Sequence, residues 1–440
     1  MMDSNELKKK VSAAIDRSRD EIISIGDAIL SRPEMGFKEI KTAQGIAKVF
    51  RSLGLEYEEN LAVTGLKSTI KGRSSKLKVA VIGEMDAVIC PSHPQADTST
   101  GAAHSCGHNA QVASMLGVAY GLVHSGIMEE LDGDVAFMAV PAEEFVELEY
   151  REHLKSTGKI SFFGGKQELI RLGVFDDIDM AMMVHSHGGT VERKAFINGG
   201  GSGFVGKMVR FKGREAHAGG APHEGVNALN AAMLAIMGIH VQREVFRDED
   251  GIRVHPIITR GGDLVNIVPA DVRMETYVRG KNIEAILSAN EKVNRAIKAG
   301  ADCVGAEAEI NEIPGYLPLN QDKRLGELFA NNISPFIGAD HVIRGVDMIG
   351  STDIGDLSTI MPVIQPTMGG FKGQAHSRDF EIVDKEAAYI LPAKAMAMTI
   401  IDLLYNGAVT GKKIREEFKP QYSREEYLRV WKAFLIQNHL

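Results

Sequence analysis

The feature that most restricts the fold of this chain is an apolar run at Leu77–Met85, LKVAVIGEM, in which β-branched residues recur. The run has no polar break in its middle, which is typical of a strand buried on both faces of a sheet. Two more strand-like stretches follow, Asp134–Val140 and Met180–Val184, and a helix-like stretch, Gly107–Val123, lies between the runs. Because strands and helices alternate, we expect a layered α/β domain whose largely parallel sheet is flanked by helices.

Further elements extend this domain at both ends. A near-helical period of apolar residues predicts one helix over Asn5–Leu30 and another over Lys38–Leu53, which Gly54 would end. Towards the C-terminus we expect a strand at Met361–Gln365, a helix at Lys385–Leu404 and a charged helical tail at Glu416–Leu440. No role for this tail follows from its sequence.

The pattern changes after the glycines at 199–201, where a second order of elements begins. We expect a strand, a long helix, two strands, a helix and a last strand, at Phe204–Lys212, Glu224–Phe246, Arg253–Arg260, Ala270–Arg279, Ile283–Ala299 and Val304–Ile310. This βαββαβ order is the ferredoxin-like, split-βαβ unit. The sequence therefore predicts an inserted α+β domain over residues 199–314, within a catalytic domain made of residues 1–198 and 315–440.

Composition excludes several classes of protein. The chain of 440 residues has a formal net charge of -8 and a pI near 6.0, whereas a general nucleic-acid binder needs a basic surface. Three scattered cysteines do not form a disulfide framework, so a reducing compartment is expected. The N-terminal lysines precede no apolar stretch, and the longest apolar run, Leu229–Val241, is shorter than the ~20 residues that span a bilayer. We expect a cytoplasmic protein without nucleic-acid or membrane partners.

The segment HSCGHN, from His104 to Asn109, is the most informative for chemistry. Cys106 and His108 stand two apart at an expected strand-to-helix junction, where both side chains could reach one ion. Thiolate and imidazole suit zinc and other borderline metals. A buried structural cysteine beside surface histidines is the general alternative. A cysteine nucleophile is a weaker one, because Cys and His this close in sequence rarely meet in attack geometry.

Adjacent carboxylates, Glu143 and Glu144, directly follow a predicted strand. Such neighbours repel each other unless a cation neutralises one of them, although a random pair usually just faces solvent. Two histidines, His185 in MVHSH and His376 in GQAHSRDF, also lie at or just beyond the ends of expected strands. Ligands of open α/β sheets bind at this carboxyl edge. The coincidence favours a metal site there.

A series of motifs extends these observations over nearly the whole chain, beginning at RPEMGF (Arg32–Phe37). In order they are GEMDAV, HSCGHN, VPAEE, MVHSH, REAHAGGAPHEGVNAL, DLVNIVPA and GQAHSRDF. This series resembles the carboxypeptidase G2-like superfamily of zinc or manganese metallopeptidases and aminoacylases. More narrowly, it is similar to the branch of hippurate, indole-acetyl-amino-acid and aminobenzoyl-glutamate hydrolases. The stretches CGHN, PGYLPLN and STDIGDLS resemble the aminobenzoyl-glutamate hydrolase type best.

The resemblance implies a role for each matching residue. Two divalent ions, zinc or manganese, would be bound by Cys106, His108, Glu144, His185 and His376. Glu143 would be the general base, and Asp86 would orient a ligand. His217 of the insert, a lid and dimerisation domain in this family, would stabilise the oxyanion.

Other polar residues are less informative. Asn266 and Arg279 of the insert are our candidates for binding a substrate carboxylate, although either could equally be a structural residue. His187 and His223 match no family role and are expected to be solvated. Asn109 replaces the aspartate usual in the amino-acid amidohydrolases of this branch. Arg378 could be a surface residue or could face an acidic substrate.

The function implied is hydrolysis of the amide bond of an N-acyl amino acid, an aminobenzoyl-glutamate-like compound or a dipeptide. Water activated by the metals would attack, with a glutamate as general base. The expected assembly is a homodimer formed through the insert. The main alternative is a non-catalytic or partner-dependent metal-binding subunit of a heteromeric amidohydrolase. A carbamoyl-amide hydrolase is disfavoured by the Cys106-Gly107-His108 ligand set.

Overall fold

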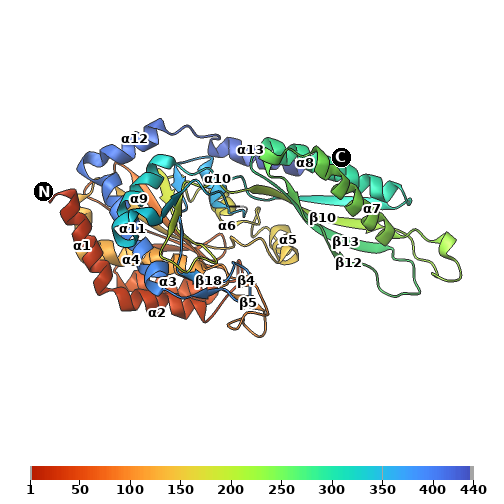
Figure 1. The fold of residues 1–440 in the computed structure, drawn as a ribbon, viewed down its shortest axis with the longest axis horizontal. Coiled ribbons are helices and arrows are strands. Elements are labelled where there is room, and N and C mark those ends of the chain that lie inside the picture. Colours follow the sequence, from red (N-terminus) through yellow and green to blue (C-terminus); the bar gives the residue numbers. More distant parts are fainter. Residues whose placement is uncertain (1, 349, 437–440) are drawn as a thin grey trace. The chain divides into compact units, whose positions relative to one another are not determined.

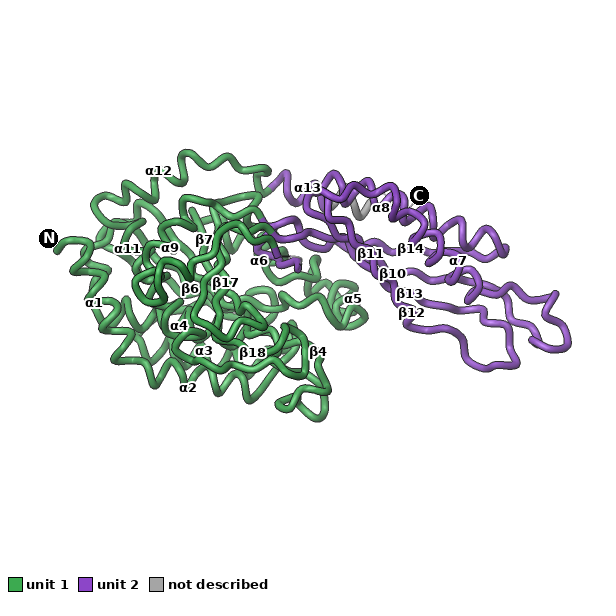
Figure 2. Tube along the Cα trace, viewed as in Figure 1, with its two compact units in different colours: residues 1–200, 320–347, 356–424 green, residues 201–319, 348–355, 425–440 purple. Residues whose placement is uncertain are grey.

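The computed structural model of the chain describes residues 2–348 and 350–436, and it divides into two compact units. Unit 1 comprises Met1–Gly200, Asn320–Asp347 and Asp356–Arg424, and unit 2 comprises Gly201–Leu319, Met348–Gly355 and Glu425–Leu440 (Figure 2). The boundaries expected from the sequence, 199 and 314, lie near these divisions. Unit 2 also takes in three segments that the sequence did not assign to the insert. One reason is local pairing, because the Ser202 N–H donates to Gly350 O and the backbone of Gly201 pairs with that of Leu319.

A six-stranded sheet forms the centre of unit 1, among the helices drawn in Figure 1. Its strand order is β1-β2-β6-β3-β7-β16. Its strands are β1 (Tyr57–Leu61), β2 (Gly65–Ile70), β3 (Lys78–Glu84), β6 (Asp134–Val140), β7 (Met180–Met182) and β16 (Val363–Ile364). The last four run parallel, whereas β1 and β2 form an antiparallel hairpin at one edge. Six of the seven residues of β3 are buried. The predicted layered α/β fold with a largely parallel sheet is confirmed.

Helices cover this sheet and complete the core of unit 1. They include α1 (Ser4–Arg17), α2 (Arg19–Leu30), α3 (Ile40–Ser52), α4 (His108–Ser125), α5 (Leu148–Ser156), α6 (Gly165–Arg171), α9 (Lys323–Ile337), α11 (Leu391–Leu404) and α12 (Val409–Glu417). Helix α4 is buried over most of its length, because it packs on β3 and also contacts α1, α2 and α11. The segment Glu386–Leu404 is long and apolar enough to cross a membrane, but 89% of it is buried inside the protein, as in a core helix.

The prediction of one continuous helix over Asn5–Leu30 is wrong, because two helices, α1 and α2, are separated at Ser18. The Ser18 N–H donates to Ala14 O and Ile15 O, which closes α1, while Ser18 O accepts the first hydrogen bond of α2 from Ile22. The Ser18 hydroxyl lies 3.1 Å from His124 Nδ1 of α4. The apolar period continues across the break, so the sequence does not reveal it.

Short strands lie within the connections around the carboxyl edge of the six-stranded sheet. A four-stranded sheet contains β8 (His185–Ser186), β9 (Ala195–Ile197), β15 (Val342–Arg344) and β17 (Thr367–Met368). Two hairpins pair β4 (Val88–Ile89) with β5 (Ala102–Ala103) and β18 (Phe371–Lys372) with β19 (Glu381–Ile382). Sequence patterns did not predict these elements, because two or three residues are too few to show a period.

Unit 2 contains an antiparallel sheet with two helices on one face. Its elements are β10 (Gly203–Lys212), α7 (Ala228–Val241), β11 (Arg253–Val254), β12 (Ile257–Arg260), β13 (Asp271–Gly280), α8 (Ile283–Asp302) and β14 (Glu307–Pro314). The strand order is β11-β13-β10-β14, and β12 also pairs with β13. The βαββαβ order is confirmed, although the second strand is split at His255-Pro256. Proline has no N–H to donate to a ladder, which accounts for the interruption.

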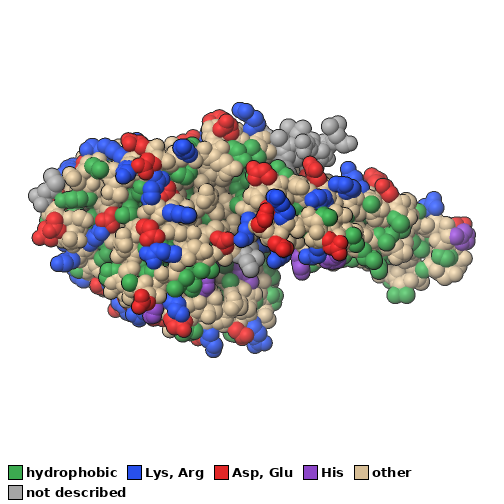
Figure 3. All heavy atoms as spheres, turned by 45° about the horizontal axis from the view of Figure 1, so that its top comes forward, with side chains coloured by type: hydrophobic (Ala, Val, Ile, Leu, Met, Phe, Trp, Pro, Cys, Tyr) green, Lys and Arg blue, Asp and Glu red, His purple; other side chains and the backbone are tan. Residues whose placement is uncertain are grey.

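The charged tail expected at Glu416–Leu440 is not one helix. Helix α12 ends at Glu417, and α13 (Arg424–Ile436) follows after a short connection. Residues 437–440 of this predicted tail lie outside the described residues. Acidic and basic side chains are interspersed over the face of the molecule drawn in Figure 3.

Candidate metal centre

Seven of the residues singled out from the sequence lie around the carboxyl edge of the unit 1 sheet. Asp86 follows β3, the pair Glu143-Glu144 follows β6, and His185 follows β7. Because these three strands are parallel neighbours, their carboxyl ends meet at one edge. The start of α4 brings Cys106 and His108, and the loop between β18 and β19 brings His376.

The donor atoms at this edge form two compact groups that share Cys106. In one group, ligand atoms of Cys106, His108 and His185 all lie within 4.8 Å of one another. In the other, those of Cys106, Glu144 and His376 do the same. Within the groups, Cys106 Sγ is 3.5 Å from His185 Nε2, and His376 Nε2 is 3.0 Å from Glu144 Oε1. The five residues expected to bind metal are therefore close enough to hold two neighbouring ions.

The Cys106-Gly107-His108 turn owes its shape to the glycine. Gly107 has a φ of 82° and caps the N-terminus of α4. A Cβ atom there would lie 2.8 Å from Ser186 Cβ, closer than two carbons can pack. Only glycine meets both requirements, the left-handed backbone and the close approach. The turn thereby directs the side chains on either side of it to the same place.

Hydrogen bonds to the outer ring nitrogens orient His108, which is buried, and His185, which is partly buried. His108 Nδ1 is 2.9 Å from Asp86 O and 3.2 Å from Asp86 Oδ1, and His185 Nδ1 is 2.9 Å from Ser186 O. A proton on each Nδ1 leaves the lone pair of each Nε2 for an ion. Asp86 Oδ2 also accepts the Glu144 N–H at 2.8 Å, so one carboxylate positions two of the expected ligands.

Burial and opposite charges shift the pKa values of this cluster strongly. Burial, together with the nearby Cys106 thiolate, raises the pKa of Glu144 to about 7. Hydrogen bonds with Cys106 and Glu144 raise the pKa of His376 to about 11. Burial alone would raise the pKa of the Cys106 thiol, but His185 and His108 hold it well below its usual range. Cys106 and His376 thus favour their charged forms because of their neighbours, whereas Glu144 is shifted towards its neutral form.

The donor set fits divalent metal ions. Two buried donor atoms of the cluster, His108 Nε2 and Glu144 Oε1, lie against other ionisable groups of the site, Glu84 Oε2 at 3.1 Å and His376 Nε2 at 3.0 Å. Buried carboxylates and a thiolate brought this close together are stabilised when a cation binds between them. A thiolate, three imidazoles and a carboxylate match the ligand preference of zinc and similar ions.

Glu143 and Glu144 are both buried, so they do not simply face solvent, as the alternative interpretation had it. Each is 7% exposed. Glu143 Oε2 lies 3.9 Å from His108 Nε2, and a third group of possible ligand atoms joins Glu143 and His108 with Glu84. Sequence reasoning missed Glu84, the last residue of β3. Its signal was a charged residue at the end of an otherwise apolar strand.

The remaining predicted site residues, His217, Asn266 and Arg279, belong to unit 2. His217 Nδ1 accepts the N–H groups of Gly219 and Gly220 at 3.2 and 2.9 Å, which places the ring proton on Nε2. The Ala218 N–H donates to Asn266 O, so the loops of His217 and Asn266 are neighbours. His217 and Asn266 are exposed.

Arg279 lies on β13, on the sheet face away from the helices. Its guanidinium lies 5.5 Å from the ring centre of Phe204 and 5.4 Å from that of Tyr277. It lines a cavity of about 430 Å³ together with His255 and Glu275. The position is compatible with contact to an anionic group, and also with a structural role in the sheet.

Two histidines without a family role differ from each other. His223 is exposed, as expected. His187 is not a solvated residue: its ring stacks on Phe196 with centres 3.7 Å apart, and its Nδ1 lies 2.9 Å from Thr367 Oγ1. Both partners come from strands that the sequence pattern did not predict, which explains the error.

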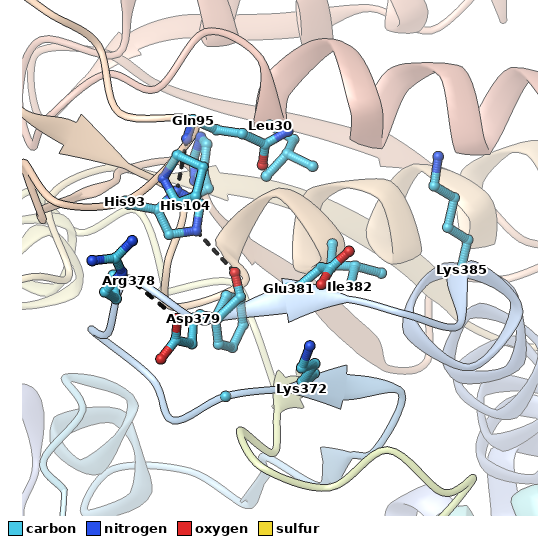
Figure 4. A pocket seen from close by; sticks show the side chains of 13 residues that line it. Leu30, His93, Gln95, His104, Lys372, Arg378, Asp379, Glu381, Ile382 and Lys385 are labelled. Carbon is cyan, nitrogen blue, oxygen red and sulfur yellow. Dashed lines mark hydrogen bonds and ion pairs between the residues drawn. The ribbon is translucent and has the colours of Figure 1, made fainter.

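The two departures from the family pattern have local explanations. Asn109 donates to Gly26 O and to Tyr389 Oη, both at 3.2 Å, bonds that an aspartate could not donate. Arg378 is 67% exposed, with Nε 3.7 Å from Asp379 Oδ1. It lines a cavity of about 590 Å³ that His93, His104 and Lys372 also line (Figure 4).

Comparisons with known proteins agree with this fold and site. Residues 200–309 match the peptidase dimerisation domain of the M20 type. The chain is 27% identical to an Xaa-Arg dipeptidase of Mus musculus, over 96% of this chain and 95% of that protein. It is 23% identical to one subunit of the p-aminobenzoyl-glutamate hydrolase of Escherichia coli (strain K12), over 92% and 93% of the two chains. A dinuclear metal-binding peptidase of the M20 family from Bacillus subtilis superposes with a TM-score of 0.63, at 21% identity, over 89% of this chain and 99% of that one.

The resemblance drawn from the motifs is thereby confirmed. The chain has the fold of a dinuclear metal-binding peptidase of the M20 family, and its insert matches a peptidase dimerisation domain. The relatives include a dipeptidase and a subunit of an aminobenzoyl-glutamate hydrolase.

Proposed function

We propose that this protein is a metal-dependent hydrolase that cleaves the amide bond of a dipeptide, an N-acyl amino acid or an aminobenzoyl-glutamate-like compound. The main observation in favour is the cluster of a thiol, three imidazoles and a carboxylate, in which Cys106, His108 and Glu144 are buried, with a second buried carboxylate, Glu143, beside it. The names of the relatives, which include an Xaa-Arg dipeptidase and an aminobenzoyl-glutamate hydrolase subunit, support the same reaction type.

The cluster would hold two divalent ions, zinc or manganese. Cys106, His108 and His185 would bind one ion, and Cys106, Glu144 and His376 the other, because these are the groups whose donor atoms lie together. When bound, such ions polarise an amide carbonyl and lower the pKa of water. Asp86 would keep the ring of His108 and the backbone of Glu144 in position for binding.

Glu143, beside the cluster, would carry the proton steps. Glu143 accepts a proton from the attacking water and returns it to the leaving nitrogen. His217 would donate a hydrogen bond from its Nε2–H to the oxygen that becomes negative in the tetrahedral state, since its Nδ1 accepts two backbone N–H groups. Asn266 and Arg279 are our candidates for binding the substrate carboxylate, Arg279 because it combines a fixed charge with a position on an open sheet face.

We further propose a cytoplasmic homodimer formed through unit 2. The exposed side of α7 carries Met233, Met237 and Val241, which are 53%, 63% and 71% exposed and recur every four residues. This spacing places them in one stripe of the helix. The match of residues 200–309 to a dimerisation domain supports the same assignment. Light scattering of the purified protein is expected to give the mass of a dimer, and a monomer at micromolar concentration would contradict the proposal.

A second candidate is a partner-dependent subunit, inactive alone. It is favoured by one observation, the similarity to a protein that is named as one subunit of a hydrolase. Under this alternative, the purified chain would bind metal and hydrolyse no substrate until a partner chain is added.

The experiment that separates these candidates pairs metal content with turnover. The purified chain is supplied with zinc or manganese and assayed on N-acyl amino acids, aminobenzoyl-glutamate and dipeptides. Glu143→Gln should keep its metal and lose about 10²–10⁴-fold in kcat, the usual contribution of a general base. Glu144→Gln, its neighbour and matched control, should lose metal and activity together. If Glu143→Gln retains metal and wild-type kcat, the proposed proton transfer is wrong.

A further inference from the structure

Glu84 lies inside the candidate metal centre although it is not among the five expected ligands. It is the last residue of β3 and is fully buried. One of its oxygens, Oε2, lies 3.1 Å from His108 Nε2. That nitrogen is the one left for an ion by the bond of Nδ1 to Asp86.

The contact between these two atoms requires a positive charge between them, either a second ring proton on Nε2 or a metal ion. With a single ring proton on Nδ1, Nε2 presents a lone pair and the carboxylate oxygen presents another, so the charge is that of an ion. His108 is fully buried. Two donors bound to one zinc ion at about 2.0–2.2 Å, with angles of 90–109°, lie about 2.8–3.6 Å apart. The observed 3.1 Å falls within this interval.

The carboxylate of Glu84 is fixed at both oxygens. Lys166 Nζ of α6 donates to Oε1 at 2.5 Å, and Gln111 Nε2 of α4 donates to Oε2 at 2.7 Å. The Gln111 side chain also accepts the Glu84 N–H at 3.3 Å. Lys166 is fully buried as well. Partners of this kind hold a metal ligand in its binding orientation and tune the charge that it offers.

We propose that Glu84 is a further ligand of the ion bound by His108, and that Lys166 reduces the negative charge that this carboxylate offers to the ion. The inference rests on the metal centre of the proposed function. The alternative is that Glu84 and Lys166 form a structural ion pair with no contact to metal. A buried pair of this kind is strongly destabilised when only one partner is removed, so single substitutions alone cannot decide.

Three variants separate the two assignments. Glu84→Gln removes the ligand charge, Lys166→Met removes the ammonium, and Glu84→Gln/Lys166→Met removes both and leaves no unpaired buried charge. Each full-length protein is stripped with a chelator and reloaded with zinc. Metal stoichiometry is measured by elemental analysis, and affinity by competition with a chromophoric chelator. Cobalt reloading adds a visible spectrum that reports the coordination of the ion, independently of turnover.

For a ligand, Glu84→Gln should weaken the binding of one of the two ions by more than about 100-fold, the upper end for loss of an outer hydrogen-bonding partner. The double variant should remain equally weak, with a cobalt spectrum unlike that of the wild type. Lys166→Met should bind this ion as tightly as the wild type or more tightly. If Glu84→Gln does not fold, the charge-balanced double variant carries the test.

Two results would overturn the inference in different ways. A double variant with wild-type affinity and cobalt spectrum would show that the pair is structural, and would leave the proposed function intact. A wild-type protein that binds no stoichiometric metal would remove both the inference and the proposed function.

Discussion

Replacement of Asp86 by asparagine probes the hydrogen bonds that orient the candidate metal ligands. Asp86 Oδ1 is 3.2 Å from His108 Nδ1, and Oδ2 accepts the Glu144 N–H at 2.8 Å. Both neighbours present an N–H group, so both sites need an acceptor. Asparagine offers one acceptor and one donor. In either orientation of the amide, one N–H therefore meets another.

The size of the effect follows from this conflict. If the amide NH₂ faces His108, it meets the Nδ1–H, which Asp86 O still accepts at 2.9 Å, and the two donors repel each other. If it faces Glu144, a buried N–H loses its acceptor. A buried donor without a partner costs about 1–3 kcal/mol. If the metal-bound state bears this cost, affinity falls about 5- to 150-fold, since 1.4 kcal/mol is a factor of ten.

The assay is a zinc competition titration of Asp86→Asn beside wild type, with circular dichroism to check the fold. Asp132→Asn is the matched control. Asp132 is equally buried and accepts from Arg73 and Ser74, but it precedes β6, at the strand end opposite to Glu143. The control should lose stability and keep metal affinity. The reasoning is refuted if Asp86→Asn binds zinc within about threefold of wild type, less than the weakest effect calculated above.

Three further predictions use the same site and its surroundings. Cys106→Ser and His108→Ala should each lose metal by elemental analysis with the fold intact, and full retention in both would remove the site from this region. Gly107→Ala should lower both the thermal midpoint and metal content, because its Cβ would lie 2.8 Å from Ser186 Cβ at a φ of 82°; wild-type values for both would contradict the packing argument. Burial, assisted by the nearby Asp86 carboxylate, raises the pKa of Glu39 to about 8. The protonated Glu39 side chain therefore contributes fully to the free energy of unfolding below the pKa that it has in the unfolded chain. This contribution is lost as the pH rises towards 8, by about 1.4 kcal/mol per pH unit. Glu39→Gln should therefore lose less thermal stability than wild type between pH 6 and 9, and equal losses would exclude this titration.

The parts of the fold that could be predicted from the sequence are those with a local pattern. The run Leu77–Met85 predicts β3 because a strand buried on both faces needs apolar residues throughout. The hairpin of β1 and β2 was not predicted. In β1 three of five residues are exposed and polar, so no alternation is visible. The break at Ser18 was missed for a related reason, since the apolar period runs on across it.

Site residues that follow the ends of strands could be predicted from the sequence. Site residues whose role depends on contacts with distant parts of the chain could not. Glu143-Glu144 and His185 are recognisable because the polar residues come directly after apolar strands. Glu84 was overlooked, because its partners Lys166 and Gln111 are distant in sequence and only the fold brings them to it.

The discontinuous course of unit 1 also has a consequence for how the protein is made. The ribosome synthesises the donor residues of the cluster at two separate times. Those up to His185 come first, and His376 follows about 190 residues later. At about 5–20 residues per second this delay lasts about 10–40 seconds. The whole of unit 2 from Gly201 to Leu319 is synthesised within it. The nascent chain thus holds the Cys106 thiol and its neighbours without their last partner, and during this period chaperones and the free metal ions around the chain would determine what first occupies the site.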